Sequence, residues 1–160
     1  MHIPEIVRGG GGVIATLRRC DGVYECPVDA AGKACGPLVG YTGQYESVDG
    51  TLLNYVGFVY YNVAKGDQWP HIVGHWTRVH AQQLARFNPD VLAAAPVGGI
   101  SYMSALKQQL GCRGIFADKK VLEAAQEGRR EKSRLLFGRY DICKGDRVVL
   151  IEDIINNFST

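Results

Sequence analysis

The sequence predicts an α/β fold in which helices flank a parallel sheet. Short apolar runs at 91–95, 114–117 and 148–151 have the length and composition of buried strands, and 100–110 carries apolar residues at helical spacing. A strand, a helix and a strand joined by short connections imply parallel strands and a right-handed crossover. With 160 residues, the chain is predicted to form a single domain, 1–160.

Two helices can be predicted in some detail. Pro70 opens the first, which ends before Pro89, because proline disfavours helix in the residue that precedes it. Its core-facing residues are predicted to be Ile72, Trp76, Val79 and Phe87, with Leu84 at the margin. The stripe of the second helix is predicted to be Met103, Leu106 and Leu110, with Gly111 just past the helix end.

The N-terminal part of the sequence is less regular. Residues 1–50 are rich in Gly and Pro, and short strands are expected at 13–17 and 38–41. The aromatic and β-branched stretch 53–63 predicts a strand whose aromatic side chains lie in the core rather than forming a stacking platform. The charged stretch 123–134 fits either a solvated helix or a mobile flap.

Composition places the chain among ordinary globular proteins. It is 46% apolar and 21% charged with a net charge of +2, a balance that favours neither nucleic acid nor membrane as a partner. No apolar run approaches the roughly 20 residues that span a bilayer, and no signal-peptide pattern is present, so we expect a cytoplasmic location. The five cysteines contain no Cys-x2-Cys pair, and buried or half-buried free thiols are expected rather than zinc ligands.

The end of the sequence carries the strongest functional signal. The predicted strand 148–151 leads into Glu152 and Asp153, and amide and hydroxyl side chains follow at 156–160. Open α/β sheets bind ligands at the carboxyl ends of their strands, and a carboxylate buried without a partner costs free energy. The pattern therefore predicts a site for a polyhydroxylated, phosphorylated ligand. The alternative is an acidic pair that complements the dipole of a helix N-terminus.

A Gly-Gly turn upstream suits an anion. Val97, Gly98 and Gly99 lie between the predicted strand 91–95 and the helix that follows. Two glycines there allow backbone N–H groups to approach a phosphate closely. The alternative is a turn that serves only packing.

Several segments together resemble the type I phosphoribosyltransferases, and orotate phosphoribosyltransferase above all. The segment 148–160 resembles the family's signature for phosphoribosyl pyrophosphate (PRPP), with a phosphate loop that departs from the usual letters. Segment 90–100 resembles the family's diphosphate loop, 114–120 its Phe-Ala-Glu-Lys strand end, and 135–147 its lead into the signature strand. In the loop, Asn-Asn replaces two threonines and Phe-Ser replaces two glycines.

The resemblance implies a Rossmann-like PRPP-binding core, 66–160, beneath an irregular N-terminal hood, 1–65. The implied reaction transfers phosphoribosyl from PRPP to a nucleobase, with orotate giving orotidine 5′-monophosphate and pyrophosphate in pyrimidine nucleotide biosynthesis. A homodimer is implied, and Mg²⁺ is expected to arrive with PRPP rather than in a metal site made by the protein alone. Because the sequence stops inside the phosphate loop, we expect a C-terminally truncated, incomplete core.

The resemblance also assigns roles to individual residues. The residues with implied catalytic roles are Glu152, Asp153 and Lys119. The residues implied to bind PRPP are Val97, Gly98, Gly99, Lys119, Lys120, Arg139, Glu152, Asp153, Asn156, Asn157, Phe158, Ser159 and Thr160. For the lysines, a solvated strand exit is the alternative.

Other functions stay open at this point. The altered phosphate loop is compatible with a PRPP-binding regulatory module that lacks catalysis, and a transferase for another base is a further alternative. A generic dinucleotide-binding domain ranks last, because no Gly-x-Gly-x-x-Gly follows the first core strand.

Overall fold

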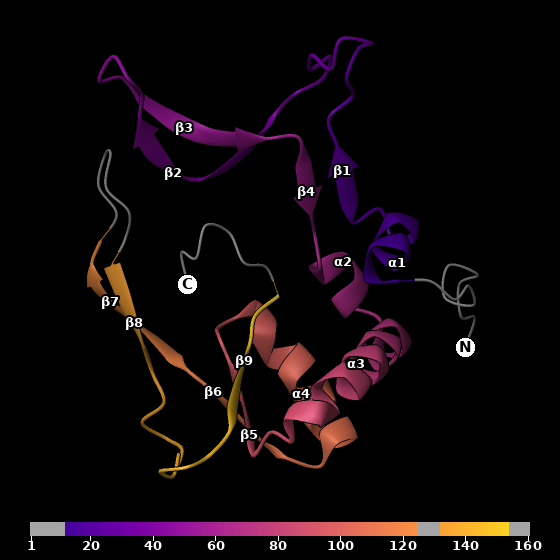
Figure 1. The fold of residues 1–160 in the computed structure, drawn as a ribbon, viewed down its shortest axis with the longest axis vertical. Coiled ribbons are helices and arrows are strands. Elements are labelled where there is room, and N and C mark those ends of the chain that lie inside the picture. Colours follow the sequence, from indigo (N-terminus) through magenta and orange to yellow (C-terminus); the bar gives the residue numbers. More distant parts are fainter. Residues whose placement is uncertain (1–11, 125–131, 154–160) are drawn as a thin grey trace.

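The computed structural model describes residues 12–124 and 132–153, and it has the predicted α/β architecture (Figure 1). The N-terminal elements are α1 (Val13–Arg19), β1 (Val23–Glu25), β2 (Val39–Glu46), β3 (Leu52–Gly57) and β4 (Val59–Tyr61). The elements that follow are α2 (Ala64–Asp67), α3 (Pro70–Leu84), a 3₁₀ turn (Ala85–Phe87), β5 (Val91–Ala94), α4 (Gly98–Leu110), β6 (Arg113–Phe116), β7 (Asp118–Glu123), β8 (Lys132–Leu136) and β9 (Val148–Ile151). No helix in the described part of the chain is both long and apolar enough to cross a membrane.

The predicted parallel sheet is confirmed, with the strand order β6-β5-β9. Val91 of β5 pairs with Arg113 of β6 on one side and with Val148 of β9 on the other. All four residues of β5 are buried, as expected for a central parallel strand covered on both faces. Because the three strands run in the same direction, their carboxyl ends lie along one edge.

Helices α3 and α4 cover one face of this sheet. The core cluster beneath them consists of Ala81, Leu92, Ala94, Met103, Leu106 and Ile151. The predicted stripe of α4 is confirmed, with Met103 and Leu106 buried and Leu110 half-buried against the same cluster. Gly111 ends the helix in the left-handed conformation at φ 67°. A positive φ of this kind favours glycine, which has no Cβ to clash with the backbone.

The predicted core face of α3 is only partly correct. Ile72 and Trp76 are buried, but Val79 and Phe87 are exposed. The buried set also includes Val73, Thr77 and Ala81, because α3 packs against α1 through Ile72 and Trp76 and against α4 further along. The helix gives way to a 3₁₀ turn after Leu84, which breaks the helical period before Phe87.

The opposite face of the sheet is covered by the segment between β8 and β9. Phe137 and Tyr140 pack against Val91, Ala93 and Ile115. On β9, which lies at the edge of the sheet, Val148 and Leu150 are exposed. This face is therefore covered over β5 and β6 and more open over β9.

The N-terminal elements differ from the sequence-based expectation in two places. Residues 13–17 form a helix rather than a strand, because Val13 and Leu17 are four residues apart and pack together against Ile72 and Trp76. The stretch 53–63 is divided between β3 and β4, and the predicted core position of its side chains is wrong. Strand β3 forms a hairpin with β2, and β4 pairs with β1, both away from the parallel sheet (Figure 1), so aromatic residues such as Phe58 and Tyr60 remain exposed. The strand expected at 38–41 is confirmed as part of β2.

The charged stretch 123–134 is bounded by strands rather than lying within a helix. Strands β7 and β8 form an antiparallel pair in which Lys120 faces Arg134. Residues 125–131 of this stretch lie outside the described part of the chain. The cysteines are free, but Cys35 and Cys143 are exposed, which contradicts the expectation of buried or half-buried thiols for these two.

A charged cluster joins the amino ends of the sheet strands. Arg147, just before β9, donates from Nε and its backbone N–H to Asp90, just before β5, at 2.9 Å each. Arg113 of β6 pairs with Asp146 at 2.6 Å. The guanidinium of Arg147 holds the pKa of Asp90 well below its ordinary value of 3.8. These contacts fix β5, β6 and β9 in register at the end of the sheet away from their carboxyl termini.

We predict an acid-dependent loss of stability from the Asp90–Arg147 pair. Because the folded state lowers the pKa of Asp90, the pair contributes fully above the ordinary pKa of 3.8, and its contribution is lost as the pH falls toward the folded value. Asp90→Asn should lower the free energy of unfolding at pH 7 and flatten its decrease below about pH 4. Urea unfolding between pH 7 and pH 2.5 measures both. An unchanged slope in the variant would contradict the role of this pair.

Candidate functional site

The structure brings the Gly-Gly turn and the acidic pair into contact. Gly98 and Gly99 begin α4 after a three-residue connection, 95–97, from β5, and Glu152 and Asp153 follow the neighbouring strand β9. A Cβ at Gly98 would overlap the Asp153 carboxylate, and a Cβ at Gly99 would lie 2.6 Å from the carbonyl oxygen of Ile151. The two segments are separated by more than fifty residues in sequence and meet because β5 and β9 are parallel neighbours.

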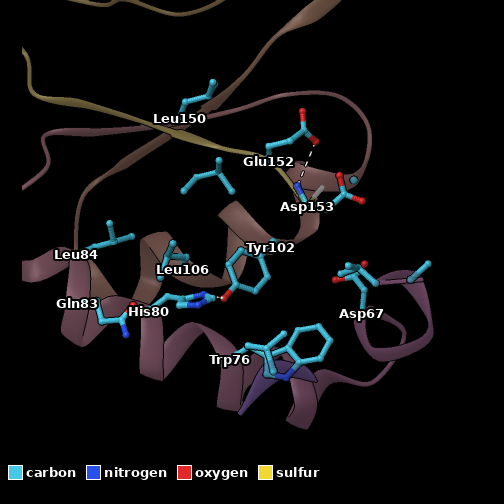
Figure 2. Close-up of a pocket in the computed structure, with 15 residues that line it drawn as sticks. Asp67, Trp76, His80, Gln83, Leu84, Tyr102, Leu106, Leu150, Glu152 and Asp153 are labelled. Carbon is cyan, nitrogen blue, oxygen red and sulfur yellow. Dashed lines mark hydrogen bonds between the residues drawn. The ribbon is translucent and has the colours of Figure 1, made fainter. Parts of the chain in front are cut away.

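A pocket of about 290 Å³ lies below this contact. Figure 2 shows Glu152 and Asp153 on one side of it and Trp76 on the other, with Tyr102 of α4 between them. The backbone N–H of Asp153 donates to Oε1 of Glu152 at 3.1 Å. The lining consists of Val13, Val63, Ala64, Asp67, Trp76, His80, Gln83, Leu84, Gly98, Tyr102, Leu106, Leu150, Ile151, Glu152 and Asp153. Both acidic residues therefore face a cavity.

Two titratable side chains on the floor of the pocket are hydrogen-bonded to each other. Nδ1 of His80 is hydrogen-bonded to the hydroxyl of Tyr102, and their rings lie edge to face with centroids 5.8 Å apart. Burial lowers the pKa of His80 from its ordinary 6.5 and raises the pKa of Tyr102 well above its ordinary 10.0. Both side chains are therefore neutral near pH 7. Nearby, the buried indole Nε1 of Trp76 has no acceptor among the described residues.

A second acidic contact lies at the same helix N-terminus. The Ser101 hydroxyl donates its single hydrogen to the carboxylate of Asp67, the last residue of α2, with Oγ 2.8 Å from Oδ1 and 2.7 Å from Oδ2. Ser101 lies in the first turns of α4, three residues after Gly98. The first turns of α4 are therefore flanked by two carboxylates, those of Asp67 and Asp153.

The charge of the pocket is negative. Asp67, Glu152 and Asp153 line it, and none of the described residues in the lining is Lys or Arg. Within residues 12–124 and 132–153, no group of three His, Cys, Asp or Glu side chains is arranged to hold a metal ion. Positive charge for an anionic ligand has to come from outside the lining.

The cationic residues expected at the site lie on neighbouring segments. Lys119 and Lys120 are exposed on β7, which begins two residues after β6 ends. Arg139 pairs with Asp118, the first residue of β7, at 3.2 Å and is also exposed. Val97 precedes α4 and is 82% exposed. The expected phosphate-loop residues Asn156, Asn157, Phe158, Ser159 and Thr160 lie outside the described part of the chain.

Sequence reasoning missed several residues in and beside this pocket. Asp67 and Ser101 carry no motif, and His80 and Tyr102 meet only because α3 packs against α4. Trp76 was predicted only as a core residue, and it is buried while also lining the pocket. For Ser101 and Tyr102, the sequence offers one local signal, which is their position directly after the Gly-Gly turn and Ile100.

The sequence match to one curated protein agrees with the motifs. No family model matches the chain. Over 96 residues it is 27% identical to the orotate phosphoribosyltransferase of Caldanaerobacter subterraneus subsp. tengcongensis, a match that covers 60% of this chain and 45% of that protein. The crystal structure of purine phosphoribosyltransferase from Pyrococcus horikoshii Ot3 aligns with a TM-score of 0.40 and 26% identity, covering 47% of this chain and 49% of that one.

These matches extend over only part of each relative. The chain spans about half the length of the two proteins it is compared with. Its PRPP-like motif, its Gly-Gly turn and the sequence match together relate it to the type I phosphoribosyltransferases. Within that class, the curated protein that it matches is an orotate phosphoribosyltransferase.

We predict that His80 titrates below its ordinary pKa of 6.5, because burial disfavours the charged imidazole. Protonation then opposes folding, so His80 should cost stability as the pH falls from about 6.5 toward its lower folded pKa. The imidazole signals in an NMR titration give the midpoint directly, and His80→Gln identifies the resonance. A midpoint at or above 6.5 would show that the ring is more solvated than the structure indicates.

Glycine is required at the contact between α4 and β9. Gly99→Ala should destabilise the protein by about 1–3 kcal/mol, because its Cβ would lie 2.6 Å from the backbone of Ile151. Gly74→Ala is the matched control inside α3, where an added Cβ meets nothing within 4 Å outside the helix's own backbone. The control should stabilise by roughly 0.5–1 kcal/mol, because alanine favours helix. Chemical denaturation compares the two variants, and equal effects would contradict the close approach.

Proposed function

We propose that this chain transfers a phosphoribosyl group from PRPP to a nucleobase. The observation that carries the proposal is the contact of Asp153 with the Gly98–Gly99 turn at the carboxyl edge of a parallel sheet. An acidic pair for ribose hydroxyls and a helix N-terminus for a diphosphate then lie side by side. This is where open α/β sheets bind ligands.

Glu152 and Asp153 are proposed to hold the ribose. Their carboxylates accept hydrogen bonds from the sugar hydroxyls, and both face the pocket. When the bond from the anomeric carbon to the diphosphate breaks, its electron pair leaves with the diphosphate and positive charge develops on the sugar ring. Fixed negative charge nearby stabilises that state, as in glycoside cleavage. The base nitrogen then supplies its lone pair to the same carbon and releases its proton to water.

The first turn of α4 is proposed to bind the diphosphate. The backbone N–H groups of its first turn and the positive end of the helix dipole favour an anion, and α4 is 13 residues long. Lys119 and Lys120 lie on β7 just beyond the carboxyl end of β6. Arg139 forms an ion pair with Asp118, the first residue of β7. We assign these residues to neutralising the leaving group. Residues 156–160 are proposed to bind the 5′-phosphate.

Mg²⁺ is proposed to bind together with PRPP. The described lining includes the carboxylates of Glu152 and Asp153, which suit a hard cation that takes most of its ligands from the substrate and water. When bound, it would neutralise part of the diphosphate charge.

The proposed acceptor is orotate, which would place the protein in pyrimidine nucleotide biosynthesis. The support is the 27% identity to an orotate phosphoribosyltransferase, together with the segments that resemble that enzyme. A cytoplasmic homodimer is proposed on the same basis.

A PRPP-binding module without catalysis is the second candidate. The observation that favours it is the acidic pocket, whose described lining has three carboxylates and no cation to assist the departure of diphosphate. Binding of PRPP without turnover would select this function.

The test is PRPP-dependent loss of orotate absorbance. Asp153→Asn should lower kcat at least about tenfold, because it removes negative charge beside the reacting ring. Asp141→Asn is the matched control, since Asp141 is exposed on the segment before β9 and should leave turnover unchanged. Adenine, guanine and uracil serve as alternative acceptors. Failure of all four bases, with PRPP binding intact by calorimetry, would leave the regulatory function.

A further inference from the structure

Asp67 connects the N-terminal elements to the turn that is proposed to bind diphosphate. It ends α2, a short helix that follows β4 almost directly. Its carboxylate accepts the single hydrogen of the Ser101 hydroxyl, whose Oγ lies 2.8 Å and 2.7 Å from the two carboxylate oxygens, across 34 residues of sequence. This is a tertiary contact between two helices rather than a local cap.

The position of Asp67 is fixed by packing rather than by its own short helix. Its neighbour Gly66 is buried against the ring of Trp76, where a Cβ would overlap the indole. Trp76 is 1% exposed and is held in a core cluster with Leu17 and Ile72. The carboxylate of Asp67 is therefore presented to α4 from a rigid base formed by α1 and α3.

Ser101 transmits this contact to the proposed site. It lies three residues after Gly98, so the two residues share one side of the helix, one turn apart. Gly98 in turn contacts the Asp153 carboxylate. Asp67 and Asp153 thus hold the beginning of α4 from two directions, and both line the same pocket.

We infer that Asp67 is a positioning residue that acts through Ser101 to fix the first turn of α4 for the diphosphate of PRPP. The inference rests on the proposed function and adds a residue to it. The negatively charged side chain of Asp67 does not suit direct contact with an anion. Asp67 therefore contributes through the Ser101 hydroxyl, whose hydrogen its carboxylate accepts. Losing the contact should weaken binding of PRPP rather than slow the chemical step, because the acidic pair remains in place.

The experiment measures kcat, KM and the calorimetric Kd for PRPP with Mg²⁺ in matched variants. Asp67→Ala and Ser101→Ala should each raise the KM and Kd for PRPP about fivefold, because each removes one charge-assisted hydrogen bond at an accessible position. The kcat of each variant should change less than about twofold. The double variant should be no worse than either single variant, because both remove the same contact. Asp67→Asn and Ser101→Thr, which keep an acceptor and a hydroxyl, should restore values near those of the wild type.

Ser104→Ala is the control, since it removes a hydroxyl from the same helix three residues further on and should leave KM unchanged. Thermal unfolding of each variant shows whether a change in KM accompanies loss of fold. Unchanged KM in both alanine variants, additive effects in the double variant, or a fall in kcat alone would overturn the inference while leaving the proposed function in place. Absence of PRPP binding by the wild type would overturn the proposed function, and this inference with it.

Discussion

The close approach of α4 to the end of β9 is the constraint on which the site depends. Gly99 lies against the backbone of Ile151, and Gly98 lies against the carboxylate of Asp153. Neither contact has room for a Cβ, so the pair of glycines is a packing requirement as well as an anion-binding feature. A role in packing and a role in anion binding are therefore compatible for Gly98 and Gly99.

The distribution of charge separates the two ends of the sheet. At the amino end, Asp90, Arg113, Asp146 and Arg147 pair with one another and join the strands. At the carboxyl end, Asp67, Glu152 and Asp153 line one pocket, and the nearby cations lie on β7 and on the segment before β9. Opposite charges that pair with each other hold the fold together, whereas like charges gathered around a cavity suit a ligand with hydroxyl donors or a bound cation.

The core of the fold followed from the sequence because its signals are local. Apolar runs predict strands at 91–95, 114–117 and 148–151, and helical spacing predicts the stripe of Met103 and Leu106. The short connections predict that the strands are parallel, whereas their order β6-β5-β9 comes from the structure. The errors lie where tertiary context overrides local pattern. Residues 13–17 form a helix because Leu17 packs against α3. The aromatic stretch 53–63 is largely exposed because its strands pair with β1 and β2, away from the parallel sheet.

The sequence by itself determined the strand–turn–helix core, the acidic pair after β9 and the Gly-Gly turn after β5, since each is encoded within a few consecutive residues. Only the tertiary structure decided that Asp153 rests on Gly98, that His80 bonds to Tyr102, and that Asp67 holds Ser101. These contacts join segments that lie 22 or more residues apart. They arise from the packing of α2, α3 and α4 around the sheet edge, which no local sequence pattern encodes.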